Sequence, residues 1–499
     1  MCANIESERS KSKVLRRQET MKLRKKILLL TVTVVCISSL AGAVYAMTEE
    51  EKWTQFKEKG ITLNFLTEDT PAAGAILDLL PEFAEKTGIK VNVTRTNVGD
   101  LVTKLMLELG SGSSEIDIIY AARWQIPPAY SSVLVDVSRF NNDPTLPHIS
   151  MDDFFKPHLI STSHFVDKQR QIGVPHDAST LMWFYRKDIF DKYKKAFMAE
   201  KGYDWTPGPN LDWEQYKEIA RWINDNVSEV KYGAGHMAKQ WNSLYCDFSN
   251  VFWAWGARGF ENPNTESWGV IFPGRCLWDS PEAIEAAKFY KDLINNVAHP
   301  SCPSWDWSDL AEAFAKGDEI AMSFNWHDFV VTFEDPARSK VPGKVGVALA
   351  PKGKDGKSHN YYSGAALAIN SYVPEDHQRA AWLFLVWQAS IPVQKAIFKK
   401  GSTPVRKSAY QDPEVRQWIA EKRYPGAGIA DVMYEAWKPE NLEYVEAKMP
   451  MFVETLIIQY TELAYMLQGL KTPEQAMKDI VDQVNQATGW TDLQEKLKQ

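Results

Sequence analysis

Apolar and polar positions along the chain follow two periods, one typical of strands and one typical of helices. Residues 61–66 alternate between apolar and polar side chains, which predicts a strand, and a polar loop is expected at 67–71. Residues 75–86 carry apolar side chains at helical spacing and end before Gly88, which predicts a helix with a glycine cap. The same patterns predict strands at 89–93, 116–120, 180–185, 321–325, 345–349 and 365–369, and helices at 101–109, 213–226, 281–296, 310–316, 378–388 and 472–487. Strands that alternate with helices predict an α/β fold whose ligands bind near the carboxyl ends of strands.

The first 46 residues have the layout of a secretory signal peptide. Met21 opens a basic stretch, an apolar run follows over residues 27–40, and small residues end at Ala46. The apolar run of ~14 residues is shorter than the ~20 residues that a membrane-spanning helix needs. We therefore expect export with cleavage after residue 46, and either Met1 or Met21 as the start.

The five cysteines bear on anchoring and on disulfides. Cys36 lies in the middle of the apolar run and lacks the Leu-x-Ala/Gly sequence that precedes the cysteine of a lipoprotein, so we expect a soluble periplasmic protein without a lipid anchor. Cys246, Cys276 and Cys302 remain after cleavage. A disulfide between Cys276 and Cys302 is one expectation for an oxidising compartment, and three buried thiols are the other.

Charge and motif content exclude several function classes. Residues 1–46 hold nine basic and three acidic side chains, so their removal changes the net charge from −7 to −13. A strongly acidic protein is a poor partner for nucleic acid or anionic membrane surfaces. The nine histidines lack zinc-site spacing, and no nucleophile elbow or phosphate loop is present. We expect no cofactor, no metal and no catalytic residue.

Seven short segments, in order along nearly the whole mature chain, resemble the family 1 extracellular solute-binding proteins of ABC importers, the family of maltose-binding protein. They lie at residues 83–91, 114–119, 173–175, 185–190, 313–322, 401–406 and 469–476. The resemblance implies a two-lobed, type II-like periplasmic binding protein fold with hinge crossings near Pro175, Ser363 and Pro404. It also implies a monomer that closes on its ligand and docks on an ABC permease.

The implied division follows from those crossings. Residues 1–46 are the upstream extension and signal peptide. Residues 47–174 with 363–404 form the first lobe, and residues 175–362 with 405–499 form the second. The ligand is expected in a cleft between the lobes.

The candidate ligand-binding residues suit a carbohydrate. Sugars present apolar C–H faces and hydroxyl groups, so their sites combine aromatic platforms with a few polar side chains. All 19 tryptophans follow residue 46, and several lie beside predicted elements or at positions where the family contacts its ligands. The aromatic candidates are Trp124, Trp253, Trp255, Trp305, Trp307, Trp326 and Tyr361, and the polar candidates are Glu68, Asp69, His176, Asp177 and Asp328.

Each candidate has a competing structural role. A tryptophan can belong to the core, the carboxylates can cap a helix, and His176 with Asp177 can serve the hinge. Other tryptophans occupy positions inside predicted elements and are assigned to the core: Trp183, Trp222, Trp382 and Trp387.

The sequence thus predicts the substrate-binding component of an ABC importer for a sugar, oligosaccharide or polyol. Two alternatives stay open. One is a secreted carbohydrate-active enzyme, and the other is a sensor that presents a ligand to a membrane kinase.

Overall fold

The computed structural model describes residues 47–122, 132–164, 170–261, 273–444, 449 and 451–492. The predicted signal peptide (residues 1–46) and the candidate Trp124 lie outside the described residues. The chain divides into two units, residues 1–52 and 53–499, and α2 (Glu49–Thr54) spans their boundary. The three sheets formed by the described residues belong to the second unit. No helix in the described ranges is long and apolar enough to cross a membrane.

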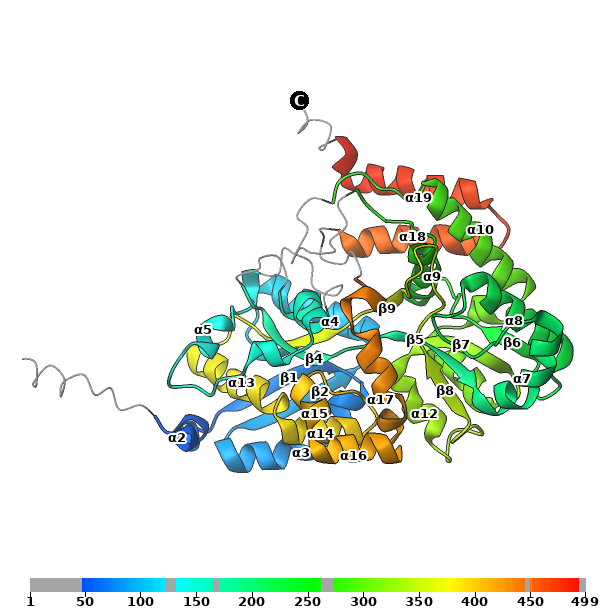
Figure 1. The fold of residues 1–499 in the computed structure, drawn as a ribbon. Coiled ribbons are helices and arrows are strands. Elements are labelled where there is room, and N and C mark those ends of the chain that lie inside the picture. Colours follow the sequence, from blue (N-terminus) through cyan, green and yellow to red (C-terminus); the bar gives the residue numbers. More distant parts are fainter. Residues whose placement is uncertain are drawn as a thin grey trace, which may run out of the picture. The chain divides into compact units, whose positions relative to one another are not determined.

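The first sheet has five strands in the order β2-β1-β3-β10-β4. Its strands β1, β2 and β4 are labelled in Figure 1. Its strands are β1 (Thr62–Glu68), β2 (Lys90–Thr96), β3 (Ile118–Ala122), β4 (Gly173–Asp177) and β10 (Ala365–Ile369). β1 pairs in parallel with β2 and β3, whereas β10 pairs antiparallel with β3 and β4. Its main helices are α3 (Pro71–Thr87), α4 (Val98–Ser111), α13 (Glu375–Gln388) and α14 (Ile391–Lys399). Phe384 of α13 packs edge-on against both Phe65 of β1 and Phe83 of α3, so this helix pair closes one core.

The second sheet has four strands in the order β6-β7-β5-β8. They are β5 (Leu181–Arg186), β6 (Tyr232–Gly235), β7 (Ile320–Trp326) and β8 (Val345–Ala348). The helices of this part are α7 (Lys187–Lys201), α8 (Trp213–Asn226), α9 (Asn242–Ala254), α10 (Pro281–Asn296), α11 (Trp307–Lys316) and α12 (Val330–Glu334). Trp213 of α8 stacks on Phe324 of β7 at 4.9 Å between ring centroids, and Trp183 of β5 packs on Tyr216 of α8. Aromatic contacts therefore fill the second core.

Two chain segments that lead between the five-stranded sheet and the rest of the fold lie side by side. One runs from β4 to β5 and the other from β9 (Asn360–Tyr362) to β10. Thr180 and Tyr362 form an antiparallel bridge between them, and the Ser363 amide donates to the Ser179 carbonyl at 2.9 Å. β9 also pairs in parallel with β11 (Leu442–Tyr444).

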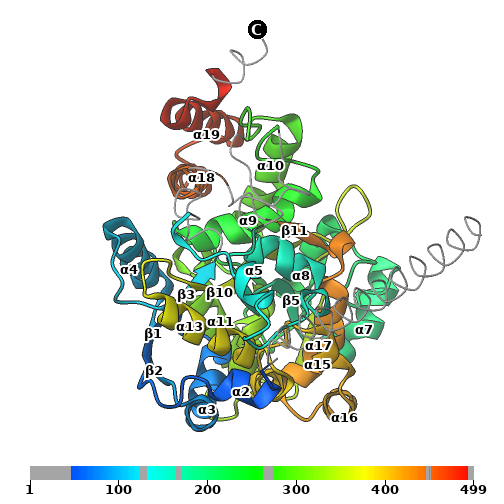
Figure 2. The ribbon, with the colours of Figure 1, turned by 90° about the vertical axis from the view of Figure 1, so that its left-hand side faces the viewer.

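The remaining elements are helices around these two cores. α18 (Phe452–Leu467) and α19 (Pro473–Thr488) lie beside α10, as both views show (Figure 2). The others are α5 (Ser138–Asn141), α6 (Lys156–His158), α15 (Lys407–Gln411), α16 (Pro413–Glu421) and α17 (Pro425–Ala436), with the single turns η2 (Met151–Asp153), η3 (Leu159–Ser163), η4 (Cys302–Ser304), η5 (His327–Phe329) and η6 (Pro439–Asn441).

The element pattern read from the sequence is confirmed in large part. The predictions at 213–226, 281–296 and 365–369 match α8, α10 and β10 in both bounds. The polar loop at 67–71 is wrong. Thr67 and Glu68 continue β1 by pairing with β2, and Thr70 already caps α3 by accepting from the Ala73 amide at 3.2 Å. The strand–helix junction is therefore tight, which fixes the direction of the side chains at 68 and 69.

The disulfide expectation is wrong as well. Cys246, Cys276 and Cys302 are all buried, and no disulfide joins them. The two suggested partners lie on different elements: Cys276 bridges Phe260 through its backbone, whereas Cys302 in η4 accepts from the His236 amide at 3.2 Å. The alternative of three buried thiols is confirmed. The predicted core tryptophans are confirmed too, since all four are buried: Trp183, Trp222, Trp382 and Trp387.

Candidate functional site

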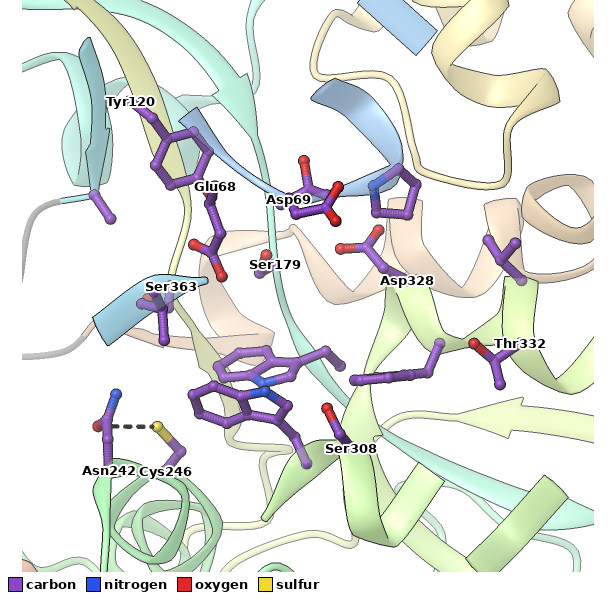
Figure 3. A pocket seen from close by; sticks show the side chains of 18 of the residues that line it. Glu68, Asp69, Tyr120, Ser179, Asn242, Cys246, Ser308, Asp328, Thr332 and Ser363 are labelled. Carbon is purple, nitrogen blue, oxygen red and sulfur yellow. Dashed lines mark hydrogen bonds between the residues drawn. The ribbon is translucent and has the colours of Figure 1, made fainter. Parts of the chain in front are cut away.

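A cleft of about 520 Å³ lies where strands of the two sheets end. Its walls include the carboxyl ends of β1, β3 and β7, the start of α11 and residues of the two connecting segments. Carboxylates occupy one side, with Glu68, Asp69 and Asp328 close together, and Asn242, Cys246 and Ser308 lie on the opposite side (Figure 3). A volume of this size suits a small organic ligand.

Two of the three carboxylates have a basic side chain as partner. Asp69 Oδ1 lies 3.0 Å from Arg95 Nη1, in an exposed ion pair. Asp328 Oδ1 lies 3.0 Å from His327 Nε2 and also accepts from Ser402 Oγ at 2.9 Å. His327 is itself fully buried, so it holds the Asp328 carboxylate in place.

Glu68 differs from its two neighbours. It is the last residue of β1, its side chain is half-buried, and its carboxylate points into the cleft (Figure 3). No described residue donates a hydrogen bond to that carboxylate or forms an ion pair with it. Desolvation and the nearby carboxylates of Asp177, Asp328 and Asp69 raise the pKa of Glu68 to about 8.

Asp177 supports the cleft from behind rather than lining it. It is buried at the end of β4 and accepts from the Tyr120 hydroxyl at 3.0 Å and from the Ala178 amide at 2.7 Å. Burial, followed by the charge of Asp328, raises the pKa of Asp177 to about 6. Burial also disfavours ionisation of Asp328, but the adjacent His327 outweighs it and lowers the pKa of Asp328. The pKa values of Glu68 and Asp177 are thus raised, whereas the pKa of Asp328 is lowered.

Aromatic rings form a continuous row along the other side. The centroids of Trp307 and Trp326 are 6.3 Å apart, and those of Trp326 and Tyr361 are 5.7 Å apart, both edge-to-face. Trp241 packs on Trp307 at 4.6 Å and extends the row into an adjoining groove of about 420 Å³. These ring contacts hold the side chains against one another, and the half-buried Trp307 and Trp326 both line the cleft.

Residues 78–422 match the family of bacterial extracellular solute-binding proteins. This match covers more than half of the chain. The chain is a member of that family. The predicted membership is therefore confirmed.

Two curated relatives of this solute-binding protein cover most of its length. A probable amino-acid ABC transporter periplasmic-binding protein of Sinorhizobium fredii is 23% identical over 428 residues, which are 85% of this chain and 89% of the relative. An erythritol/L-threitol-binding protein of Mycolicibacterium smegmatis is 24% identical over 365 residues, which are 71% and 72% of the two chains.

Solved structures confirm the predicted two-lobed α/β binding-protein fold. A solute-binding protein of Agrobacterium radiobacter in complex with ribitol has a TM-score of 0.69 at 23% identity and covers 86% of this chain and 99% of its own. Maltose-bound MalE3 of T. maritima has a TM-score of 0.69 at 21% identity, with 85% and 99% covered.

Half of the residues predicted from the sequence line the cleft of this solute-binding protein. These are Glu68, Asp69, Trp307, Trp326, Asp328 and Tyr361. The remaining described candidates lie behind the walls or elsewhere. Trp253 stacks on Tyr361 from behind at 5.6 Å, and the buried His176 contacts Gln388 through Nδ1 at 3.1 Å. Trp255 packs on Phe289, and Trp305 stacks on His299.

Several residues of the walls were not predicted. They include Tyr120, Ser179, Asn242, Cys246 and Ser363 in the cleft and Trp241 in the adjoining groove. Tyr120 and Ser179 lie in a strand and a connection that the sequence places correctly, so their nearness to a strand end was an available signal. Trp241 and Asn242 open α9, a helix whose pattern the sequence analysis did not detect.

Proposed function

We propose that this protein is the ligand-binding component of an ABC importer and that its cleft captures a polyol or sugar. The observation that carries the proposal is the combination of aromatic and acidic side chains in one cleft, whose walls include the half-buried Trp307 and Trp326 and the carboxyl groups of Glu68 and Asp328. Flat rings match the apolar C–H face of a polyhydroxy compound, and carboxylates accept hydrogen bonds from its hydroxyl groups. Relatives named for erythritol, L-threitol, ribitol and maltose support this class of ligand.

An amino acid fits the described walls less well. One curated relative is named for amino-acid transport. The α-carboxylate of an amino acid needs a cationic partner. Among the described residues that line the cleft, the cationic side chain is that of Arg338, which is exposed at the rim. The carboxylates that face the ligand would repel such a group.

Capture and delivery rest on a hinge. We infer a first lobe of residues 47–174 with 363–404 and a second of residues 175–362 with 405–499, which close around the ligand. The paired connections at Ser179 and Ser363 support this, because two short segments side by side absorb the rotation of one sheet against the other. The closed monomer then docks on the permease. Export through residues 1–46, without a lipid anchor, places it in the periplasm.

A thermal-shift screen tests the proposed ligand class. Ribitol, mannitol, erythritol, sorbitol, glucose and maltose are compared with a panel of amino acids. A ligand at 100 times its Kd adds about 2.7 kcal/mol to the free energy of unfolding, so a binder gives a clear rise in Tm. Stabilisation by amino acids alone would contradict the proposal. Mass spectrometry of the bound compound should recover it intact, whereas conversion to a product would favour the enzyme alternative.

A further inference from the structure

Three carboxyl groups belong to described residues that line the cleft, and one of them has no ionic or hydrogen-bonding partner within the described part of the chain. Asp69 pairs with Arg95 and Asp328 pairs with His327, each at 3.0 Å. In the adjoining groove, Asp306 pairs with Lys239, also at 3.0 Å. Glu68 lines both spaces and has no such partner among the described residues. Within the described residues, Glu68 is thus an acid without a partner at the junction of the two spaces.

Glu68 is surrounded by groups that oppose its ionisation. Asp69 follows it in the chain, Asp177 lies at the end of β4, and Asp328 follows β7. Tyr120 of β3 completes the surroundings, and burial with the Asp177 charge raises the pKa of Tyr120 well above its usual range, so its hydroxyl stays neutral. A neutral hydroxyl of a ligand can accept or donate a hydrogen bond here, but it brings no charge. A ligand cation would compensate Glu68 and reduce the repulsion among its neighbours.

We propose that the natural ligand is a cationic polyhydroxy compound, an amino sugar or amino polyol, whose ammonium group pairs with Glu68. This inference rests on the proposed function and narrows its ligand class. The opposite wall suits the same ligand, because the face of an indole attracts a cation within about 6 Å of the ring. An amino sugar or amino polyol carries an ammonium group but no carboxylate. It therefore needs no cationic partner in the cleft, where Arg338 lies at the exposed rim.

Isothermal titration calorimetry with matched compounds tests the charge directly. The pairs are 1-amino-1-deoxy-D-sorbitol with D-sorbitol, and D-glucosamine with D-glucose, with N-acetyl-D-glucosamine as a neutral amide. We expect the amine of at least one pair to bind at least tenfold more tightly than its hydroxyl partner at pH 7.5. An equal or weaker affinity of both amines would overturn the inference.

Proton release gives a second readout on the unmodified protein. Since the pKa of Glu68 is raised to about 8, its carboxyl is mostly protonated at pH 7, and a bound ammonium forces it to ionise. Binding of the amino polyol should release close to one proton, and its affinity should rise by up to tenfold per pH unit between pH 6 and 7.5. An aliphatic ammonium, with a pKa near ~10, stays charged over this range. Titrations in buffers of different ionisation enthalpy measure the release, and its absence would contradict the pairing.

Two Glu→Gln variants, one in the cleft and one outside it, test whether Glu68 causes the preference for the amine. Glu68→Gln should reduce the preference for the amine over the hydroxyl compound to less than threefold. Glu82→Gln makes the same replacement at an exposed position of α3 outside the cleft, and it should keep the preference. A preference that survives in Glu68→Gln, with an intact unliganded melt, would reject the role of Glu68. Binding of neutral polyols without amine preference would reject this inference alone, whereas binding of amino acids only would reject the proposed function as well.

Discussion

Trp183 and Trp326 lie on neighbouring strands of the same sheet and have different surroundings. β5 and β7 pair antiparallel, with Leu181 opposite Trp326 and Trp183 opposite Phe324. Trp183 is fully buried, packs edge-on against Tyr216 at 5.1 Å and stacks over Phe324. Trp326 is the last residue of β7, half-buried, and lines the cleft. Trp183 lies inside its strand and packs in the core, whereas Trp326 lies at the carboxyl end of its strand and lines the cleft. The position along the strand therefore decides which of the two roles a tryptophan takes.

Trp305 and Trp307 repeat the comparison over two residues. Asp306 between them is the N-cap of α11 and accepts from the Ser308 and Asp309 amides. This cap turns the chain, so Trp305 stacks on His299 outside the cleft while Trp307 contributes to its wall. Near neighbours in sequence thus serve different regions because a helix begins between them.

The largest expected effect comes from the interior member of the pair. Trp183→Ala removes a fully buried indole and its ring contacts, so the free energy of unfolding should fall by about 3–5 kcal/mol. Urea denaturation of the unliganded protein measures this loss. A loss below about 1 kcal/mol would show that the second core does not depend on this side chain.

Trp326→Ala should act mainly on ligand binding. Removal of a central aromatic contact typically costs about 2 kcal/mol, so the affinity for the ligand found by the screen should fall by about 30-fold. The unliganded stability should fall by much less than in Trp183→Ala, because the indole is only half-buried.

Trp326→Phe serves as the control because it keeps an aromatic face, and it should retain most of the affinity. Normal affinity with a stability loss equal to that of Trp183→Ala would instead make Trp326 a core residue.

Much of the fold was predictable from the sequence, because caps and periodicity act locally. Asp212 and Gln215 form a capping box that starts α8 where the apolar pattern begins, and Ser280 caps α10 by accepting from the Ala283 amide. α9 escaped detection for a physical reason. Its residues from Ser243 to Ala254 are all buried, including Asp247 and Asn250, so no polar stripe marks the helical period.

The acidic residues of the site were predictable because they follow strands. Glu68, Asp69 and Asp328 come at or after strand ends, and the sequence places them at the edge of the sheets. Trp241 comes close to Trp307 through tertiary packing across 66 positions, which no local pattern records. Trp253 illustrates the converse, because it sits at a position where the resemblance implies a ligand contact, yet it stacks behind Tyr361.

The smallest expected effect concerns Asp69, at the exposed edge of the same cleft. Its ion pair with Arg95 has side chains 63% and 43% exposed, whereas His327 and Asp328 are 0% and 14% exposed. Water and salt screen an exposed pair, so Asp69→Asn should change the free energy of unfolding by less than about 0.5 kcal/mol. Denaturation at low and high salt measures this, and the small difference should vanish at 1 M NaCl. A salt-independent loss above about 1 kcal/mol would mean that the edge of the cleft is held as firmly as the interior. The different stability losses expected for Trp183→Ala and Trp326→Ala would then come from the ring contacts of each side chain, and not from a difference in stability between the core and the cleft.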